Sequence, residues 1–314
     1  MTTGESAPTW TLDEMPDLTG KRALVTGVTA GIGEHTVLEL ARKGAEVIMA
    51  ARTETKLASA TEDVRRALPT ATVVPLTCDL ANLSSVRRAA AEASSYGPLD
   101  LLVNNAGVMA TPNRRTVDGF DLQLGTNHLG HFALTGLLFP QLVASGDARV
   151  VTLASLAHHW VRSIPLTDLR EPTGRYLKWV AYARSKLANL LFAFELDRRA
   201  RGAGLPVTSV AAHPGYAATE LMSGGLRLGG RTPIATMLEA VTRLLGQTST
   251  QGAMPSLMAA TMPGLPGGSY VGPGGPGEMR GAPAIVGTTK AARNEQMAAQ
   301  LWDLSERATG VRFP

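Results

Sequence analysis

The stretch that decides the fold is TGVTAGIG, Thr26 to Gly33, which directly follows an apolar β-branched run and opens a helical pattern. Glycine has no Cβ, so the backbone can turn tightly here and approach a ligand closely. The free N–H groups and the positive end of the following helix attract a phosphate. The spacing TGxxxGxG between a strand and a helix therefore predicts a loop that binds the pyrophosphate of a dinucleotide, with an ordinary glycine-bearing turn as the alternative. The loop residues expected to contact the nucleotide are Gly27, Thr29, Ala30, Gly31, Ile32 and Gly33.

The rest of the chain repeats this unit of a strand followed by a helix. Apolar β-branched runs lie at residues 23–28, 45–50, 72–78, 99–105, 148–154 and 206–212. Helical patterns follow them, at about 31–43, 54–67, 81–95, 118–144 and 178–202. Strands that are apolar throughout are buried on both faces, and right-handed crossovers place helices on both sides. We therefore predict an α/β fold: a Rossmann-like, doubly wound parallel sheet of about seven strands, flanked by helices on both faces.

The chain has 314 residues, of which 44% are hydrophobic and 18% charged, so it can bury a substantial core. This length would also suit two domains, but the strand-and-helix rhythm is continuous. We expect a short N-terminal lead, residues 1–17, and a single domain over residues 18–314. Residues 157–178 form an insertion and the Gly-, Pro- and Met-rich residues 222–285 a lid; both are expected to border the substrate.

Composition excludes several other classes of protein. The net charge is +4, but no run of basic residues accompanies it, so nucleic acid is not an expected partner. The chain has one cysteine, no apparent signal peptide and no apolar stretch long enough to span a membrane, which favours a reducing cytoplasm. Its arginine-rich usage suggests the GC-rich genome of a bacterium. The six histidines show no metal-binding pattern, so no metal site is expected.

The end of the second apolar run bears on the choice of dinucleotide. An acidic residue there would accept from both ribose hydroxyls of NAD, but this chain has Ala51 followed by Arg52. A guanidinium suits a 2′-phosphate, and the hydroxyls of Thr29 and Thr53 can add donors. We therefore expect NADP(H) rather than NAD(H), with a solvated loop arginine as the alternative. Asp79, at the end of the third run, is placed to accept from the adenine amino group, to cap the helix that starts near Asn82, or to do both.

Two further motifs complete a resemblance. The fourth run ends in Asn104-Asn105-Ala106-Gly107, and a later helical pattern carries Tyr182-Ala183-Arg184-Ser185-Lys186. Together with the glycine loop, in this order, they resemble the short-chain dehydrogenase/reductase family, closely over about residues 18–215. Residues 127–132, 155–159 and 185–189 are similar to its retinol-dehydrogenase-like and protochlorophyllide-reductase-like branch.

The resemblance implies a catalytic tetrad of Asn127, Ser155, Tyr182 and Lys186. Tyr182 would be the general acid or base, and Lys186, one helical turn away, would share its face of the helix. The lysine and an oxidised nicotinamide are expected to lower the tyrosine pKa by about three units. Ser155 would hold the substrate oxygen, and Asn127 would hold a water that links Lys186 to solvent.

The resemblance also implies the remaining cofactor contacts. They are Leu80, Asn105, Ala106, Gly107, Tyr182, Lys186, Pro214, Gly215 and Thr219. Family members associate through the long helices expected at 118–144 and 178–202, so a homodimer or homotetramer is implied.

These patterns predict an NADP(H)-dependent oxidoreductase that transfers a hydride between the nicotinamide and a carbonyl or alcohol of an apolar small molecule. Two alternatives stay open at this point. One is an NADP-dependent reductase of the carbon–carbon double bond of an enone, because such enzymes also carry the tyrosine and lysine. The other is a regulatory protein that binds the dinucleotide without turnover.

Overall fold

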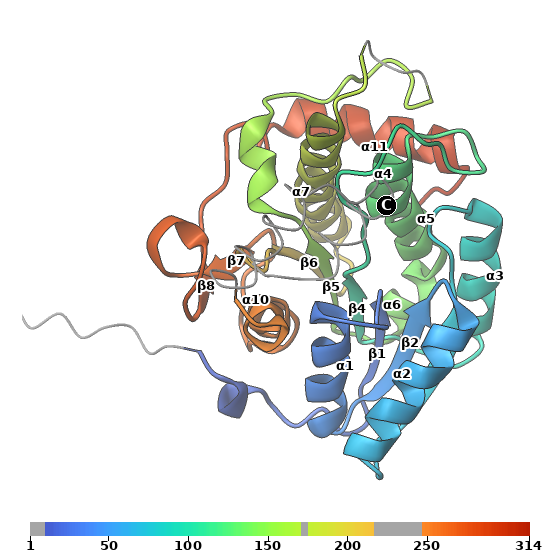
Figure 1. Cartoon of the computed structure of the whole chain (residues 1–314), viewed down its shortest axis with the longest axis vertical. Helices are drawn as coiled ribbons and strands as arrows, with labels where there is room; N and C mark the ends of the chain where they lie inside the picture. Colours follow the sequence, from blue (N-terminus) through green and yellow to red (C-terminus); the bar gives the residue numbers. More distant parts are fainter. Residues whose placement is uncertain (1–9, 171–174, 217–246) are drawn as a thin grey trace, which may run out of the picture.

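The fold is centred on one eight-stranded sheet in the order β3-β2-β1-β4-β5-β6-β7-β8 (Figure 1). The computed structural model describes residues 10–170, 175–216 and 247–314, and the following account concerns these ranges. Every pair of neighbouring strands is parallel except β7 and β8. The strands are β1 Arg22–Thr26, β2 Glu46–Ala51, β3 Val73–Thr77, β4 Leu101–Asn104, β5 Ala148–Leu153, β6 Val207–Ala212, β7 Tyr270–Pro273 and β8 Pro283–Ile285. The Rossmann-like prediction is confirmed, and the count of about seven strands is corrected to eight.

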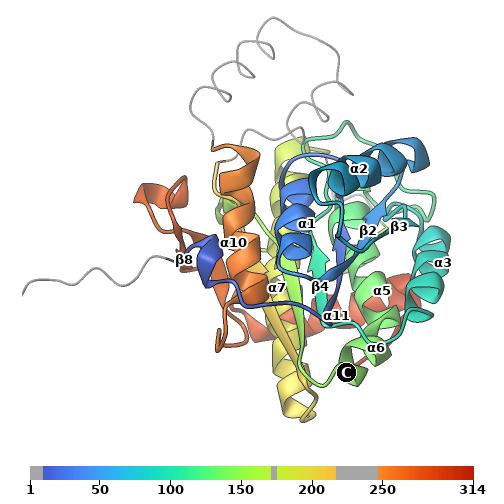
Figure 2. The same ribbon diagram turned by 90° about the horizontal axis from the view of Figure 1, so that it is seen from below.

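Helices cover both faces of this sheet (Figure 2). The longer ones are α1 Ile32–Arg42, α2 Glu54–Ala67, α3 Leu83–Ser94, α5 Gly130–Leu137, α7 Lys178–Gly202, α10 Ser249–Thr261 and α11 Glu295–Thr309. Along β1, Ala23 and Val25 join the core beneath α1, α2 and α10, whereas Leu24 joins the core beneath α3, α5 and α7. This alternation follows from the two-residue period of a strand. Both faces of the central strands are therefore apolar and buried.

Helix α11 packs against α7 and α5, two of the helices that cover the same face of the sheet as α3 (Figure 1). Trp302 of α11 lies 5.1 Å from Phe132 and 5.8 Å from Phe192, measured between ring centroids. Phe313, in the tail that follows, lies 4.9 Å from Phe132. These rings close the core over the two helices for which subunit contacts were expected.

The helix expected over residues 118–144 is divided into segments. It begins with α4, Leu122–Leu124, continues through a π-helical turn at Gly125–Leu129, and then becomes α5. A second break follows α5, and α6, Phe139–Ala144, begins with Pro140 in its first turn. Proline has no N–H to donate within a helix and clashes with the preceding turn, which accounts for the second break.

The glycine- and proline-rich region for which a lid was expected contributes partly to the core. Residues 222–246 lie outside the described residues, whereas the following segment forms α10, β7 and β8. Ala253 and Leu257 of α10 are buried against the sheet. The predicted insertion, residues 157–178, begins within a 3₁₀ turn at Leu156–Trp160, and its last residue, Lys178, is the first of α7. No helix in the described part of the chain is long and apolar enough to cross a membrane.

Candidate active site

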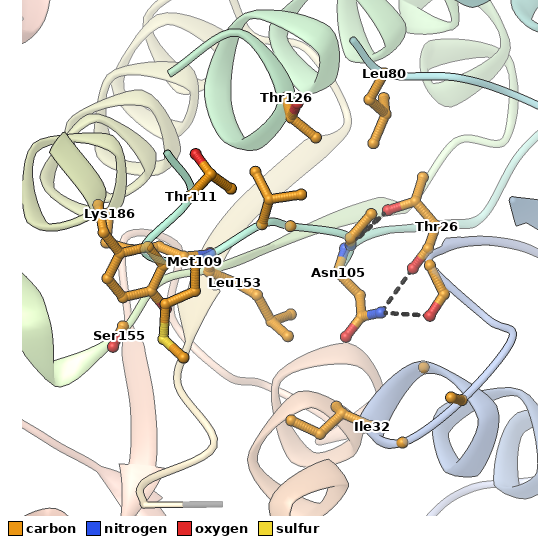
Figure 3. A pocket seen from close by; sticks show the side chains of 18 of the residues that line it. Thr26, Ile32, Leu80, Asn105, Met109, Thr111, Thr126, Leu153, Ser155 and Lys186 are labelled. Carbon is orange, nitrogen blue, oxygen red and sulfur yellow. Dashed lines mark hydrogen bonds between the residues drawn. The ribbon is translucent and has the colours of Figure 1, made fainter. Parts of the chain in front are cut away.

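A single pocket of about 1010 Å³ runs along the carboxyl ends of the parallel strands and gathers nearly all of the predicted site residues. Figure 3 shows Ser155, Lys186 and Met109 toward one end of it, and Thr26 and Asn105 toward the other. The predicted residues that line it are Gly27, Thr29, Ala30, Gly31, Ile32, Gly33, Arg52, Thr53, Asp79, Leu80, Asn105, Ala106, Gly107, Ser155, Tyr182, Lys186, Pro214 and Gly215. Thr219 lies outside the described residues, and Asn127 lies behind the pocket wall.

The glycine loop between β1 and α1 is packed too closely for side chains. Gly27 has φ +73°, and a Cβ added to it would lie 2.8 Å from the Cα of Ala106. A Cβ added to Gly33 would meet the carbonyl oxygen of Gly27. Asn105 fixes the loop from β4, because its Nδ2 donates to the carbonyls of Thr26, at 2.7 Å, and Gly27, at 3.2 Å (Figure 3). The bare backbone of this loop and the N-terminus of α1 fit a pyrophosphate.

Two basic side chains line the pocket near the end of β2. Arg52, predicted from the sequence, directly follows the strand, and Lys56 lies in the first turn of α2. Lys56 was not predicted, although its place four residues after Arg52 was visible in the sequence. Two cations at one position fit a dianionic phosphate better than one does.

Asp79 lines the pocket and does not cap the next helix. Its Oδ1 accepts from the backbone N of Ala81 at 3.0 Å. The cap of α3 is Asn82, whose Oδ1 accepts from the backbone N of Ser84 at 3.0 Å and of Ser85 at 3.3 Å. The capping alternative for Asp79 is therefore wrong, and the residue lines the pocket.

Three of the four residues of the expected tetrad meet at the end of β5. Tyr182 and Lys186 project from one face of α7, with the lysine Nζ 5.8 Å from the centroid of the tyrosine ring. Ser155 lines the pocket beside Tyr182, close enough for its side chain to influence the tyrosine pKa. Lys186 donates from Nζ to the carbonyl oxygen of Leu153 at 3.0 Å. A hydroxyl pair with a cation behind it can hold a substrate oxygen and exchange a proton with it.

Burial dominates the electrostatics of these groups. It raises the pKa of Tyr182 to about 12, against a smaller opposing effect of the Ser155 side chain. It lowers the pKa of Lys186 to about 8. The sequence had suggested a lowered tyrosine pKa in the presence of an oxidised nicotinamide. In the protein alone the direction is the reverse, because desolvation disfavours the phenolate and the lysine amine is turned toward Leu153.

Asn127 acts on the wall of the pocket from the π-helical turn. Its Oδ1 accepts from the backbone N of Val108 at 2.7 Å, and its Nδ2 donates to the Val108 carbonyl at 2.9 Å and to the Ser185 hydroxyl at 2.9 Å. Single π-helical turns are frequent at functional sites, where they change the direction of a side chain. Here the side-chain amide ties the segment after β4 to the helix that carries Tyr182.

The turn after β6 is held open toward the pocket. Gly215 has φ +69°, and a Cβ added to it would lie 2.6 Å from Nε2 of Gln247. That Nε2 donates to the carbonyls of Pro214, at 3.2 Å, and Met279, at 2.9 Å. The resulting clamp keeps the backbone of Pro214 and Gly215 at the pocket surface.

Two of the histidines, His128 and His131, serve packing. His128 is buried and its Nε2 contacts the Ser305 hydroxyl at 2.9 Å; His131 is buried and its Nε2 contacts the Thr26 hydroxyl at 2.9 Å. Burial lowers the pKa of His128 to about 3 and that of His131 to about 4, so both rings are neutral at pH 7. Among the residues that the structure describes, no cluster of three or more histidine, cysteine or acidic side chains could hold a metal ion.

The fold and this site define a class of protein, and comparison with known proteins identifies it. Residues 21–164 match the family described as short chain dehydrogenase. The chain belongs to this family of oxidoreductases, whose members bind a nicotinamide dinucleotide. Within it the chain is similar to human retinol dehydrogenase 13, with 40% identity over 300 residues that cover 94% of this chain and 86% of the relative. It is equally similar to mouse polyprenol dehydrogenase, with 40% identity over 310 residues, 95% of this chain and 86% of that one. The resemblance to retinol dehydrogenases noted in the sequence is thereby confirmed.

Solved structures agree with this assignment. The crystal structure of an uncharacterized protein from Mycobacterium paratuberculosis has a TM-score of 0.79 and 42% identity, covering 98% of this chain and all of its own. A structure described as an NAD(P)-dependent gluconate 5-dehydrogenase from Beutenbergia cavernae, with bound NADP, has a TM-score of 0.60 and 26% identity, covering 78% of this chain and 91% of its own.

Proposed function

We propose that the protein is an NADP(H)-dependent oxidoreductase that transfers a hydride between the nicotinamide and a carbonyl or alcohol of an apolar small molecule. The observation that carries this proposal is the meeting of Tyr182, Ser155 and Lys186 in the pocket that the glycine loop opens. When bound, the cofactor supplies or accepts the hydride at the substrate carbon. The chain's own residues bind and orient the substrate and exchange the proton with its oxygen.

Tyr182 is the proton-transfer group of the proposed mechanism. In the reductive direction its hydroxyl donates a proton to the substrate oxygen, and in the oxidative direction its phenolate accepts one. The Ser155 hydroxyl, beside Tyr182 in the pocket, donates to the same substrate oxygen and stabilises the charge that develops there. Lys186, with a pKa lowered to about 8, readily gives and takes a proton near neutral pH and so can restore the state of the tyrosine. Asn127 keeps the segment around Val108 in place against α7.

The preference for NADP(H) rests on Arg52 and Lys56 at the end of β2. Both would pair with the 2′-phosphate, and Thr29 and Thr53 add hydroxyl donors at the same part of the pocket. Asp79 would accept from the adenine amino group, and the turn at Pro214 would cover the nicotinamide, with Thr219 reaching the pyrophosphate.

An apolar substrate is supported by the apolar side chains that surround Tyr182. Met109 packs on the buried group of Ala157, Tyr182 and Ala183. Next to Tyr182 the pocket therefore offers apolar contact to a substrate. The relatives' names, which refer to retinol and a polyprenol, agree with a substrate of this kind.

Cytoplasmic location, a bacterial source and a homodimer or homotetramer stay predictions. The association surface expected on the long helices is covered in part, because α11 packs on α5 and α7. Gel filtration with light scattering measures the oligomeric state directly.

The deciding experiment follows NADPH absorbance with a panel of ketones, aldehydes and enones, for the wild type and for Tyr182→Phe. Loss of the general acid should lower the rate by a factor of about 10² to 10⁴ while NADPH still binds. A phenylalanine variant that keeps the wild-type rate would refute the role of Tyr182. Saturated ketone products from enones would support the double-bond reductase, and NADPH binding without any turnover would support the regulatory protein.

A further inference from the structure

Two tryptophans with large exposed surfaces lie at the pocket. Trp160 ends the 3₁₀ turn after β5 and is 64% exposed, and Trp179 lies in the first turn of α7 and is 37% exposed. Both side chains line the pocket that holds Tyr182. Indole rings are large and mostly apolar, so leaving two of them in water next to each other is unfavourable unless a ligand covers them.

The rings of Trp160 and Trp179 form what we call the aromatic corner. Their centroids are 6.1 Å apart and their planes meet at 74°, an edge-to-face arrangement. The ring of Trp179 in turn lies 6.5 Å from that of Tyr182, at 83°. A flat ring that stacks on one indole lies edge-to-face with the second indole. Stacked and edge-to-face arrangements are both favourable for aromatic pairs. A puckered saturated ring of the same size can match only one of them.

The aromatic corner is continuous with the reacting group. The ring of Tyr182 is 5% exposed and packs with Ala157 and Ala183, and Met109 and Val161 complete this small apolar cluster. The thioether of a methionine adapts to flat ligands and makes favourable contacts with ring edges. A substrate oxygen at the tyrosine hydroxyl therefore brings the adjoining part of the substrate toward Trp179.

We propose that Trp160 and Trp179 form the subsite that holds a flat apolar ring or conjugated segment next to the reacting carbonyl, and that they set a preference for flat substrates over puckered ones. This inference rests on the proposed function, since it concerns the substrate of the same pocket. Trp160 lies near the start of the insertion and Trp179 just after its end, so the two tryptophans that flank the insertion set the substrate preference.

The test compares two ketones with the same number of carbon atoms. Acetophenone carries a flat phenyl ring, and cyclohexyl methyl ketone carries the saturated ring in its place. The ratio of their kcat/KM values is measured for the wild type, Trp160→Leu and Trp160→Phe. Because each ratio is compared with that of the wild type, the different intrinsic reactivities of the ketones cancel. The ratio should fall about fivefold in Trp160→Leu, since an aromatic contact is worth a factor of roughly 2 to 13 in binding, and should recover in Trp160→Phe.

Ile285→Ala is the matched control, because Ile285 is an apolar side chain of similar exposure, 54%, on β8 and outside the pocket lining. Its ratio should equal that of the wild type. An unchanged ratio in Trp160→Leu would overturn the inference, as would a ratio that fails to recover in Trp160→Phe.

A second measurement separates this inference from the proposed function. Saturation-transfer NMR detects binding of 2-acetylnaphthalene to the protein with oxidised cofactor, where no reduction takes place. Transfer to the naphthyl protons that weakens in Trp160→Leu and Trp179→Leu supports the aromatic corner even if no ketone is turned over. Equal transfer in the wild type and both variants overturns it, whatever the catalytic result.

Discussion

Replacing the buried Lys186 with methionine should change how the stability of the cofactor-free protein depends on pH. Lys186 is 3% exposed, and burial lowers the pKa of its amine from 10.5 to about 8. Between these two values the unfolded chain binds more protons than the folded one, so the free energy of unfolding rises with pH. Each pKa unit corresponds to about 1.4 kcal/mol, so the full effect of a shift from 10.5 to about 8 is about 3 kcal/mol.

Most of this change falls in an accessible range. Between about pH 7 and about pH 9.5, titration of Lys186 should raise the free energy of unfolding of the wild type by about 2 kcal/mol. Lys186→Met has no proton to lose, and the Leu153 carbonyl keeps the hydrogen bond from Asn189 at 2.8 Å. The variant should therefore lack this part of the pH dependence.

Urea unfolding at a series of pH values measures the difference. All other titrating groups are common to the two proteins, so the wild-type curve minus the variant curve isolates the lysine. Lys290→Met, which removes an exposed lysine, is the control and should follow the wild type. Parallel curves for wild type and Lys186→Met would refute the reasoning, because the amine would then titrate alike in the folded and unfolded states.

Three further predictions follow from the pocket and the core. Arg52→Ala should weaken NADPH binding by about 10- to 100-fold, because a hydrogen bond to a charged group contributes about 1.5–3 kcal/mol. A fluorescence titration should show unchanged binding of NADH, and equal losses for both cofactors would contradict the role of Arg52. Gly33→Ala should abolish binding of both dinucleotides in the same titration, because its Cβ would meet the Gly27 carbonyl, and wild-type affinity would show that the loop need not approach the cofactor closely. Gly136→Ala should lower the free energy of unfolding by about 1–3 kcal/mol in urea, because its Cβ would lie 2.5 Å from the Phe313 ring; an unchanged midpoint would mean that the C-terminal tail is not packed there.

The parts of the site that the sequence predicted are those fixed by local geometry. Tyr182 and Lys186 share a face because one turn of α7 separates them, whatever the helix packs against. The glycine loop lies where a strand passes into a helix, so Gly27 and Gly33 could be assigned from spacing alone. Ser155 was predictable because it lies two residues after the end of β5.

The parts that the sequence did not predict depend on contacts between distant segments. The edge strand β8 has three residues, and only its antiparallel pairing with β7 makes it a strand. The π-helical turn holds Asn127, whose side chain forms two hydrogen bonds with the backbone of Val108. The helical pattern of apolar residues carries no information about these bonds to a distant segment. The raised pKa of Tyr182 likewise follows from burial. The spacing of four residues between Tyr182 and Lys186 does not indicate how deeply the tyrosine is buried.

The position of α11 has a consequence for the order in which the core is completed during synthesis. Domains fold as units while the chain emerges from its N-terminus. The cofactor loop and α7 are made early, but Phe132 and Phe192 gain the cover of Trp302 only when the last helix has been released. A chain that lacks residues 295–314 therefore leaves one side of α7, the helix that carries Tyr182, bare, and these residues close the core behind the pocket.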